Sequence, residues 1–226
     1  MKIKLSYLLI LLYTLVSCQE KSIINDLKFS SYSGHPKKIT ETVTFANQDI
    51  DKSISYFDKD GFLTKIESYN IVKSEFPDKR LISDILIYDV TNKAKRHFKS
   101  INAENKKVGA TGYFEKVSDS LYRRVSNSDA PPMSLNKLLY LDKNNRLIKT
   151  EETGNFNGTP IHSIILYTYS KGAKSEMTVE DLAHHKKNRL ICKNLNPDSQ
   201  GNFLYEELVD EHGTVHLKTE REFEYY

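Results

Sequence analysis

A weak internal repeat constrains the fold of this chain more than any single motif. Residues 56–67 align with residues 140–151, and tyrosine, aspartate, two lysines, leucine and glutamate coincide between the two segments. Further degenerate copies lie at residues 88–89, 169–172, 198–203 and 209–215. In such a copy, aspartate hydrogen-bonds the backbone of a turn, and glycine or asparagine takes its positive-φ position. The repeat therefore predicts successive antiparallel β-hairpins.

A single β-hairpin is barely stable in water, so successive hairpins must pair and bury a shared face. Runs of aromatic and β-branched residues, such as 40–45 and 82–88, are typical of strands and are separated by Asp, Asn, Gly and Lys. The sequence predicts an all-β fold, an antiparallel meander of successive hairpins that forms one curved or partly closed sheet.

Two segments depart from this pattern. Residues 178–188 are the best helical candidate, because Thr178 could cap a helix with Asp181 three residues later. Residues 126–133, with Pro131 and Pro132, form the strongest break, since proline removes a backbone donor and restricts the residue before it. The alternative is that this break divides two sub-sheets. We expect a long connection there, inside one domain, because hairpin repeats lie on both sides.

The N-terminal segment is typical of an export signal. Lys2 and Lys4 precede an uncharged, mostly apolar run over residues 5–17, which is too short to span a bilayer. The run ends in Leu15-Val16-Ser17-Cys18, which resembles the lipobox of bacterial lipoproteins. The resemblance implies that Cys18 is the lipid attachment site and becomes the mature N-terminus. The alternative is an ordinary secretory signal with an incidental cysteine.

This resemblance sets the expected organisation and location. Residues 1–17 form the signal peptide, residues 18–26 a lipidated tether, and residues 27–226 the β-hairpin repeat domain. In Gram-negative lipoproteins the residue after the cysteine biases sorting, and Gln19 favours the outer membrane over retention in the inner one. Whether the domain faces the periplasm or the cell surface stays open.

The hairpin segments resemble the YD-repeat (Rhs-like) group, and more closely envelope lipoproteins with the same aromatic-Asp-x-x-Gly hairpins. The C-terminal segment 198–226 shares this likeness. The resemblance implies a fold and a location but transfers no catalytic residue. An encapsulating shell is not expected, because the chain lacks the long, regular arrays of Rhs proteins.

Charge and cysteine content exclude several classes of function. The formal net charge is +3, and it falls to about +1 when Lys2 and Lys4 leave with the signal. A nearly neutral net charge argues against a nucleic-acid partner, because nucleic acid normally binds to a clustered basic face of a protein. The chain has only two cysteines, so acylated Cys18 would leave Cys192 without a partner and exclude a disulfide scaffold. We expect Cys192 to be a small buried hydrophobe, with a nucleophile as the minor alternative.

No motif points to catalysis, a cofactor or a metal. His184 and His185 lie near Cys192 in sequence but lack a partner pair at zinc-finger spacing, so a solvated loop is the better interpretation. His212 and His216 straddle Gly213 and are expected on opposite strands, exposed. Residues 58–61 resemble part of a calcium loop but lack its remaining acidic ligands, which favours a turn. Nucleophile elbows and phosphate loops are absent from the sequence, and no acidic pair stands out.

The fourteen tyrosines and ten phenylalanines are the remaining chemical signal. They predict cross-strand packing or, alternatively, an aromatic-lined groove for a glycan, peptide or acyl chain. The leading hypothesis is a non-enzymatic lipoprotein, anchored in the outer membrane, that presents a β-sheet binding or assembly surface to another envelope component. The first alternative is an amphiphile carrier or chaperone with a concave apolar sheet face. The others are an envelope-polymer hydrolase and an immunity protein.

Overall fold

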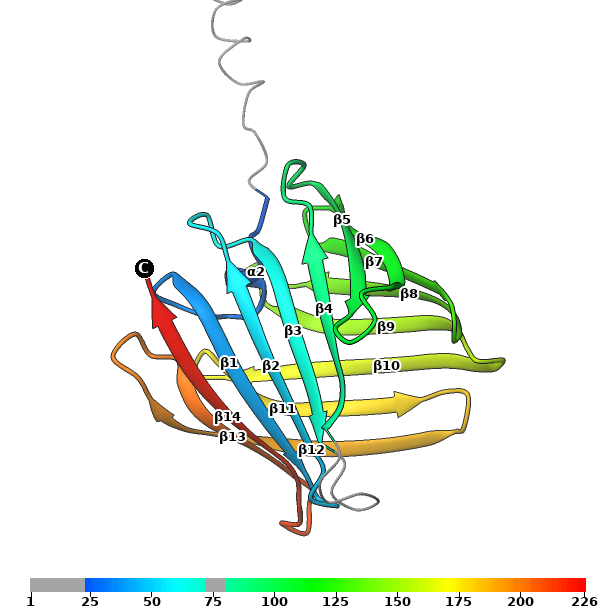
Figure 1. Ribbon diagram of the computed structural model, residues 1–226. Coiled ribbons are helices and arrows are strands. Elements are labelled where there is room, and N and C mark those ends of the chain that lie inside the picture. Colours follow the sequence, from blue (N-terminus) through cyan, green and yellow to red (C-terminus); the bar gives the residue numbers. More distant parts are fainter. Residues whose placement is uncertain (1–22, 72–79) are drawn as a thin grey trace, which may run out of the picture.

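The protein folds into a β-barrel. The computed structural model describes residues 23–71 and 80–226, and over these ranges the chain forms fourteen strands and one short helix, α2 (Asp26–Phe29) (Figure 1). The strands are β1 (Pro36–Phe45), β2 (Ile50–Phe57), β3 (Leu63–Ile71), β4 (Arg80–Tyr88), β5 (Lys95–Asn102), β6 (Val108–Ser118), β7 (Leu121–Asp129), β8 (Pro132–Leu141), β9 (Leu147–Phe156), β10 (Thr159–Ser170), β11 (Ala173–Asp181), β12 (Lys186–Pro197), β13 (Phe203–Val209) and β14 (Val215–Tyr225). Each strand pairs antiparallel with its neighbours in sequence, so the predicted all-β meander is confirmed.

The closure of the sheet corrects the sequence-based prediction. We expected a curved or partly closed sheet, but β1 pairs with β14 from Pro36 opposite Tyr225 to Phe45 opposite Leu217. This pairing satisfies the backbone groups of both edge strands, which an open meander would leave exposed. It joins segments about 180 residues apart, and no local pattern in the sequence reports such a contact.

Side chains alternate between the lumen and the outer surface, as the pleat requires. In β14, Thr219 and Arg221 face inward, while Glu220 and Glu222 face outward and are exposed. The lumen face also carries polar residues on other strands, including Asp51, Asp84, Ser126, Thr150 and Glu152. The barrel interior is therefore a mixed surface rather than a continuous apolar one.

The predicted hairpin turns are confirmed, and four of them share one geometry. In each, an aspartate accepts backbone hydrogen bonds at Oδ1 from the residues two and four positions later. The fourth residue of each turn has positive φ, between 63° and 85°. These aspartates and positive-φ residues are Asp58 and Gly61, Asp142 and Asn145, Asp198 and Gly201, and Asp210 and Gly213. The first three turns lie at the end where the chain enters the barrel, here called the mouth, and the fourth lies at the opposite end.

The other coincident residues of the repeat form a common outward-facing triad. Lys65 Nζ lies 4.0 Å from the ring centroid of Tyr56 and 2.8 Å from Glu67 Oε1. In the second copy, Lys149 Nζ lies 4.9 Å from the Tyr140 ring centroid and 2.9 Å from Glu151 Oε2. The repeat therefore encodes both a turn and a cation–π and ion-pair contact across the outer face of each hairpin.

Two local predictions are wrong. The expected helix over residues 178–188 is instead the end of β11, a turn and the start of β12, because cross-strand pairing overrides the weak capping pattern. The expected long connection at the proline pair is a tight turn, with a cis bond between Ala130 and Pro131, that joins adjacent strands β7 and β8. Within the described residues, no helix is long and apolar enough to cross a membrane.

Candidate binding cavity at the barrel mouth

Residues 24–33, which we call the mouth plug, enter the barrel mouth and contact walls on two sides of it. On one side Ile24 packs against Tyr122 and Leu141, and its backbone N–H donates to the Tyr122 hydroxyl at 3.2 Å. On the other side Leu27 packs against Ile39 and Phe57. Figure 1 shows α2, the centre of the plug, between the barrel walls at the end where the chain begins. The plug therefore closes part of the mouth.

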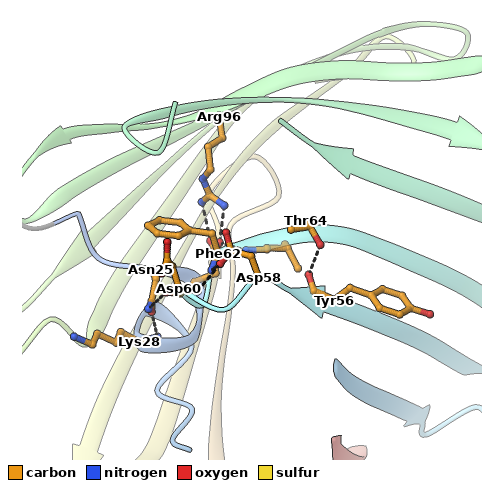
Figure 2. Close-up of polar contacts among 10 residues, drawn as sticks. Asn25, Lys28, Tyr56, Asp58, Asp60, Phe62, Thr64 and Arg96 are labelled. Atoms are coloured by element: carbon orange, nitrogen blue, oxygen red, sulfur yellow. Dashed lines mark hydrogen bonds and ion pairs between the residues drawn. The ribbon is translucent and has the colours of Figure 1, made fainter. Parts of the chain in front are cut away.

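A buried ion pair fixes the plug in the mouth (Figure 2). Arg96 donates from Nη1 to Asp26 Oδ2 at 2.5 Å and from Nη2 to Oδ1 at 2.8 Å, and its side chain is only 2 % exposed. Asp26 Oδ2 also accepts from the backbone N–H of Leu63 at 2.6 Å. Asn25 caps α2 by accepting from the Lys28 N–H, and its amide donates to the backbone oxygen of Asp60. The plug is thus joined to the β2–β3 turn and to β5 by specific polar contacts.

A cavity of about 540 Å³ lies between the plug and the wall formed by strands β9 to β14. Its rim includes residues of the β10–β11 and β12–β13 turns, both of which lie at the mouth. Aromatic side chains make up one part of its lining and polar side chains the other. The aromatic residues are Phe29, Tyr32, Tyr167, Tyr169 and Phe203, and the polar ones include Lys174, Asn194, Asn202, Glu206 and Arg221.

Five polar side chains on consecutive strands form a polar belt around this part of the lumen: Lys174, Asn194, Glu206, Arg221 and Glu41, from β11, β12, β13, β14 and β1. Lys174 Nζ lies 3.2 Å from Glu206 Oε1, and Arg221 Nη2 lies 3.9 Å from Glu206 Oε2. Arg221 Nε donates to Glu41 Oε2 at 2.7 Å across the β14–β1 pairing. Asn194 Nδ2 donates to the backbone oxygen of Lys174 at 2.6 Å.

The belt is balanced in charge and partly buried. It contains two cations and two carboxylates, and Glu206 is 6 % exposed. Such charges are tolerated in the lumen because each is paired and hydrogen-bonded. A ligand in the cavity therefore meets both donors and acceptors of the belt, and Lys171 in the exposed β10–β11 turn adds one more positive charge at the rim.

Burial controls the titration of the neighbouring groups. Burial raises the pKa of Tyr32 and of Tyr169 to about 12, so both hydroxyls are neutral at physiological pH. Burial also raises the pKa of the Cys192 thiol to about 11. Cys192 is 7 % exposed and faces the lumen opposite Leu208. The expectation that Cys192 is a small buried hydrophobe is confirmed, and a protonated thiol is a poor nucleophile.

The aromatic residues pack against one another and also line the cavity. Phe29, Phe114 and Tyr122 make edge-on and stacked contacts with ring centroids 5.4 to 5.9 Å apart, which is packing between plug and wall. Tyr167 and Tyr169 instead line the cavity. The Tyr169 hydroxyl donates to the Leu147 backbone oxygen at 2.8 Å, which holds its side chain against the wall.

The sequence-based candidates lie elsewhere. Cys18 falls outside the described residues. His184 and His185 lie in the exposed β11–β12 turn at the end opposite the mouth, and His184 Nδ1 is 2.7 Å from Asp181 Oδ2. His212 and His216 are exposed, the latter beside Asp210. No group of three or more His, Cys, Asp or Glu side chains arranged for a metal occurs in residues 23–71 and 80–226.

Sequence reasoning missed the mouth plug and the polar belt. The plug falls partly in the expected tether, residues 18–26, and its one acid, the partly buried Asp26, has no distinguishing sequence context. The belt residues occupy inward positions of their strands, but charged residues occur on both faces of this barrel. Alternation alone therefore could not separate them from outward charges.

No protein-family model and no curated protein matches the chain. Among solved structures, the chain is similar to a porin-like protein from Bacteroides vulgatus ATCC 8482, with a TM-score of 0.50 and 7% identity, over 84% of this chain and 98% of that one. A porin-like protein from Bacteroides uniformis ATCC 8492 matches with a TM-score of 0.42 and 9% identity, over 85% of this chain and 98% of that one. At this identity the likeness concerns the barrel fold alone.

Proposed function

We propose that this protein is a non-enzymatic lipoprotein, anchored in the outer membrane through Cys18, that binds a small ligand in the mouth cavity. The observation that carries the proposal is the mouth plug. It starts close behind the expected lipid attachment site and supplies Phe29 and Tyr32 to the cavity lining. One short segment would thus connect the anchor to the binding site.

The length of the tether supports a defined orientation. Ile23 lies five positions after Cys18, and five fully extended residues span at most about 18 Å. An acylated Cys18 would therefore hold the mouth close to the membrane surface. The opposite end would point away, since a nine-residue strand such as β11 alone is about 30 Å long before tilt.

The outer face of the barrel supports attachment by a lipid rather than insertion of the strands. It carries ion pairs such as Lys38 with Glu224, Lys149 with Glu151 and Arg189 with Glu176. Membrane-spanning barrels present an apolar band to the lipid, and charged side chains there are costly. These pairs lie on β1, β9, β11, β12 and β14, and others lie on the remaining strands, such as Lys65 with Glu67 on β3 and Arg123 of β7 with Glu115 of β6. The charged pairs are therefore not confined to one side.

The mixed lumen favours a polar ligand over the amphiphile-carrier alternative. A carrier for an acyl chain needs a continuous apolar interior, whereas the cavity contains charged Lys174, Glu206 and Arg221. The side chains that line the cavity bind one another, and the nearby Cys192 thiol is held protonated by its raised pKa. This arrangement is typical of a binding site rather than of a nucleophilic centre.

The anchor is tested by metabolic labelling with radioactive palmitate. Wild-type protein should incorporate the label and the Cys18→Ala variant should not. Equal labelling of both proteins would remove the basis for the membrane location.

The orientation is tested with a matched pair of fluorophore positions in a Cys192→Ser background. Lys59→Cys lies in the exposed β2–β3 turn at the mouth, and Ala183→Cys lies in the exposed β11–β12 turn at the opposite end. In full-length protein reconstituted into vesicles, a short-range quencher on the lipid headgroups should quench the label at position 59 more strongly. Equal quenching, or the reverse order, would contradict the proposal.

A further inference from the structure

We infer that the mouth cavity is a binding site for an uncharged carbohydrate. The inference rests on the proposed function, because it assigns a chemical class to the ligand of the same cavity. It is carried by the polar belt and by the tyrosines beside it. Both contribute side chains to the lining of the cavity.

The belt offers hydrogen-bond donors next to acceptors. Lys174 has three ammonium donors and uses one toward Glu206, while Arg221 donates from Nε to Glu41. Glu206 supplies carboxylate acceptors between these two cations. A sugar hydroxyl both donates and accepts, so neighbouring hydroxyls of one ring can use such a row of alternating groups.

The pairing of charges within the belt argues against an ionic ligand there, and the one further charged residue of the lining, Lys171, lies in the exposed β10–β11 turn at the rim. Each cation of the belt already has a carboxylate partner, and the pairs leave no net charge. An anionic ligand that reached Lys174 or Arg221 would lie beside buried Glu206, and a cationic ligand would lie beside the two basic groups. Like charges at such short range in a poorly solvated site repel strongly.

The aromatic part of the lining suits the apolar faces of a sugar ring. Tyr169 is tied to the wall by its hydroxyl, which donates to Leu147 O at 2.8 Å, and Tyr167 on the same strand also lines the cavity. The negative face of an aromatic ring attracts the weakly positive C–H groups of a pyranose. Side chains held in place by their own hydrogen bonds lose little entropy when the ligand binds.

An acyl chain fits this cavity less well. It would cover Lys174, Glu206 and Arg221 without replacing the water that solvates their free hydrogen-bonding positions. The volume, about 540 Å³, lies within the range of about 300–1,000 Å³ of small-molecule sites and is adequate for a short oligosaccharide. Polar groups together with aromatic rings therefore favour a neutral saccharide.

The test measures binding to full-length protein in detergent. The probes are neutral disaccharides (maltose, cellobiose, lactose and N,N′-diacetylchitobiose), the acidic digalacturonate, the basic chitobiose, and decanoate as an acyl chain. Binding is measured by saturation-transfer NMR and by equilibrium dialysis. We expect at least one neutral disaccharide to bind and the acidic, basic and acyl probes not to bind.

Two variants change the cavity in different ways. Glu206→Gln removes the central carboxylate of the belt, and Asn194→Trp places a bulky side chain at a lumen-facing position of the lining without altering a charged residue of the belt. Each should weaken saccharide binding at least tenfold. The matched control is Glu207→Gln, the next residue of β13, which faces outward and accepts from Tyr205. Its affinity should be unchanged, and circular dichroism establishes that each variant is folded.

The outcomes separate the two proposals. If a charged probe or decanoate binds and Asn194→Trp abolishes that binding, while no neutral disaccharide binds, the carbohydrate assignment is overturned and the cavity remains a binding site. If no probe binds in a manner sensitive to Asn194→Trp, both the assignment and the proposed binding function are overturned.

Discussion

Replacing Asp26 with leucine should release the mouth plug and destabilise the barrel. Asp26 is the carboxylate partner of Arg96, through hydrogen bonds of 2.5 and 2.8 Å, and it also accepts from the Leu63 N–H. With the carboxylate gone, the Arg96 guanidinium would be left at 2 % exposure without its counter-charge. Its other neighbours include the rings of Phe62, Tyr88 and Phe114, which cannot neutralise it.

The expected loss of stability follows from the burial of the Arg96 side chain. Removing one partner of a buried ion pair costs about 3–5 kcal/mol, against a total stability of about 5–15 kcal/mol for a typical protein. The double variant Asp26→Leu with Arg96→Met should recover much of this loss, because it removes the isolated charge and leaves an apolar side chain among aromatic rings.

Equilibrium unfolding in urea, followed by circular dichroism, measures both variants. The control is Glu224→Gln, which removes one partner of the exposed pair with Lys38 and should leave the midpoint unchanged. If Asp26→Leu lowered the free energy of unfolding by less than about 1 kcal/mol, the Asp26–Arg96 pair would not hold the plug as described. The same conclusion would follow if the double variant were no more stable than the single one.

Three further predictions concern turns and burial. Gly213→Val should lower the free energy of unfolding by about 1–2 kcal/mol, because valine resists the positive φ of this position. Gly61→Val should lower it further, because a Cβ at position 61 would also lie 2.6 Å from Asn25 Nδ2 in the plug. Equal urea midpoints for the two variants would contradict this prediction. The rate at which iodoacetamide alkylates Cys192 should keep rising about tenfold per pH unit beyond pH 9, because burial raises the pKa of the thiol to about 11. A rate that levels off near pH 9 would show that the thiol has an ordinary pKa. As the pH rises, the Cys192 thiol loses its proton at a lower pH in the unfolded protein than in the folded one. Its ionisation should therefore lower the free energy of unfolding between about pH 9 and about pH 11, which urea titrations at several pH values can measure.

The fold was predictable to the extent that it depends on local chemistry. The Asp-to-Gly turns at 58–61 and 198–201 were recognised because their hydrogen bonds lie within five residues. Closure was not recognised, because it depends on β1 meeting β14, and the alternation of side chains is the same in an open and in a closed sheet. The helix predicted over 178–188 failed for a related reason, since pairing with β10 and β12 decided the conformation.

The candidate site was less predictable than the fold. Lys174, Glu206 and Arg221 are separated by at least 15 residues in sequence and meet only because four successive strands bring them to one level of the lumen. Nothing in the sequence around Asp26 indicates that it forms an ion pair, because its partner Arg96 is 70 positions away. Charged residues alternate with apolar ones on both faces, so sequence offered no rule for which of them lie inside.

The closed barrel is the central claim of this account, because closure creates both the mouth and the Arg221–Glu41 contact of the polar belt. Thr42 on β1 and Glu220 on β14 are directly opposite in the closing pair and face outward. Paired Cα atoms of adjacent strands are about 4.5–5.5 Å apart, within the range that a disulfide spans. In full-length protein carrying Cys192→Ser, Thr42→Cys and Glu220→Cys, mild oxidation should give an intramolecular disulfide, detected by mass spectrometry of proteolytic fragments. Free thiols under those conditions, or only intermolecular dimers, would show that the sheet is open.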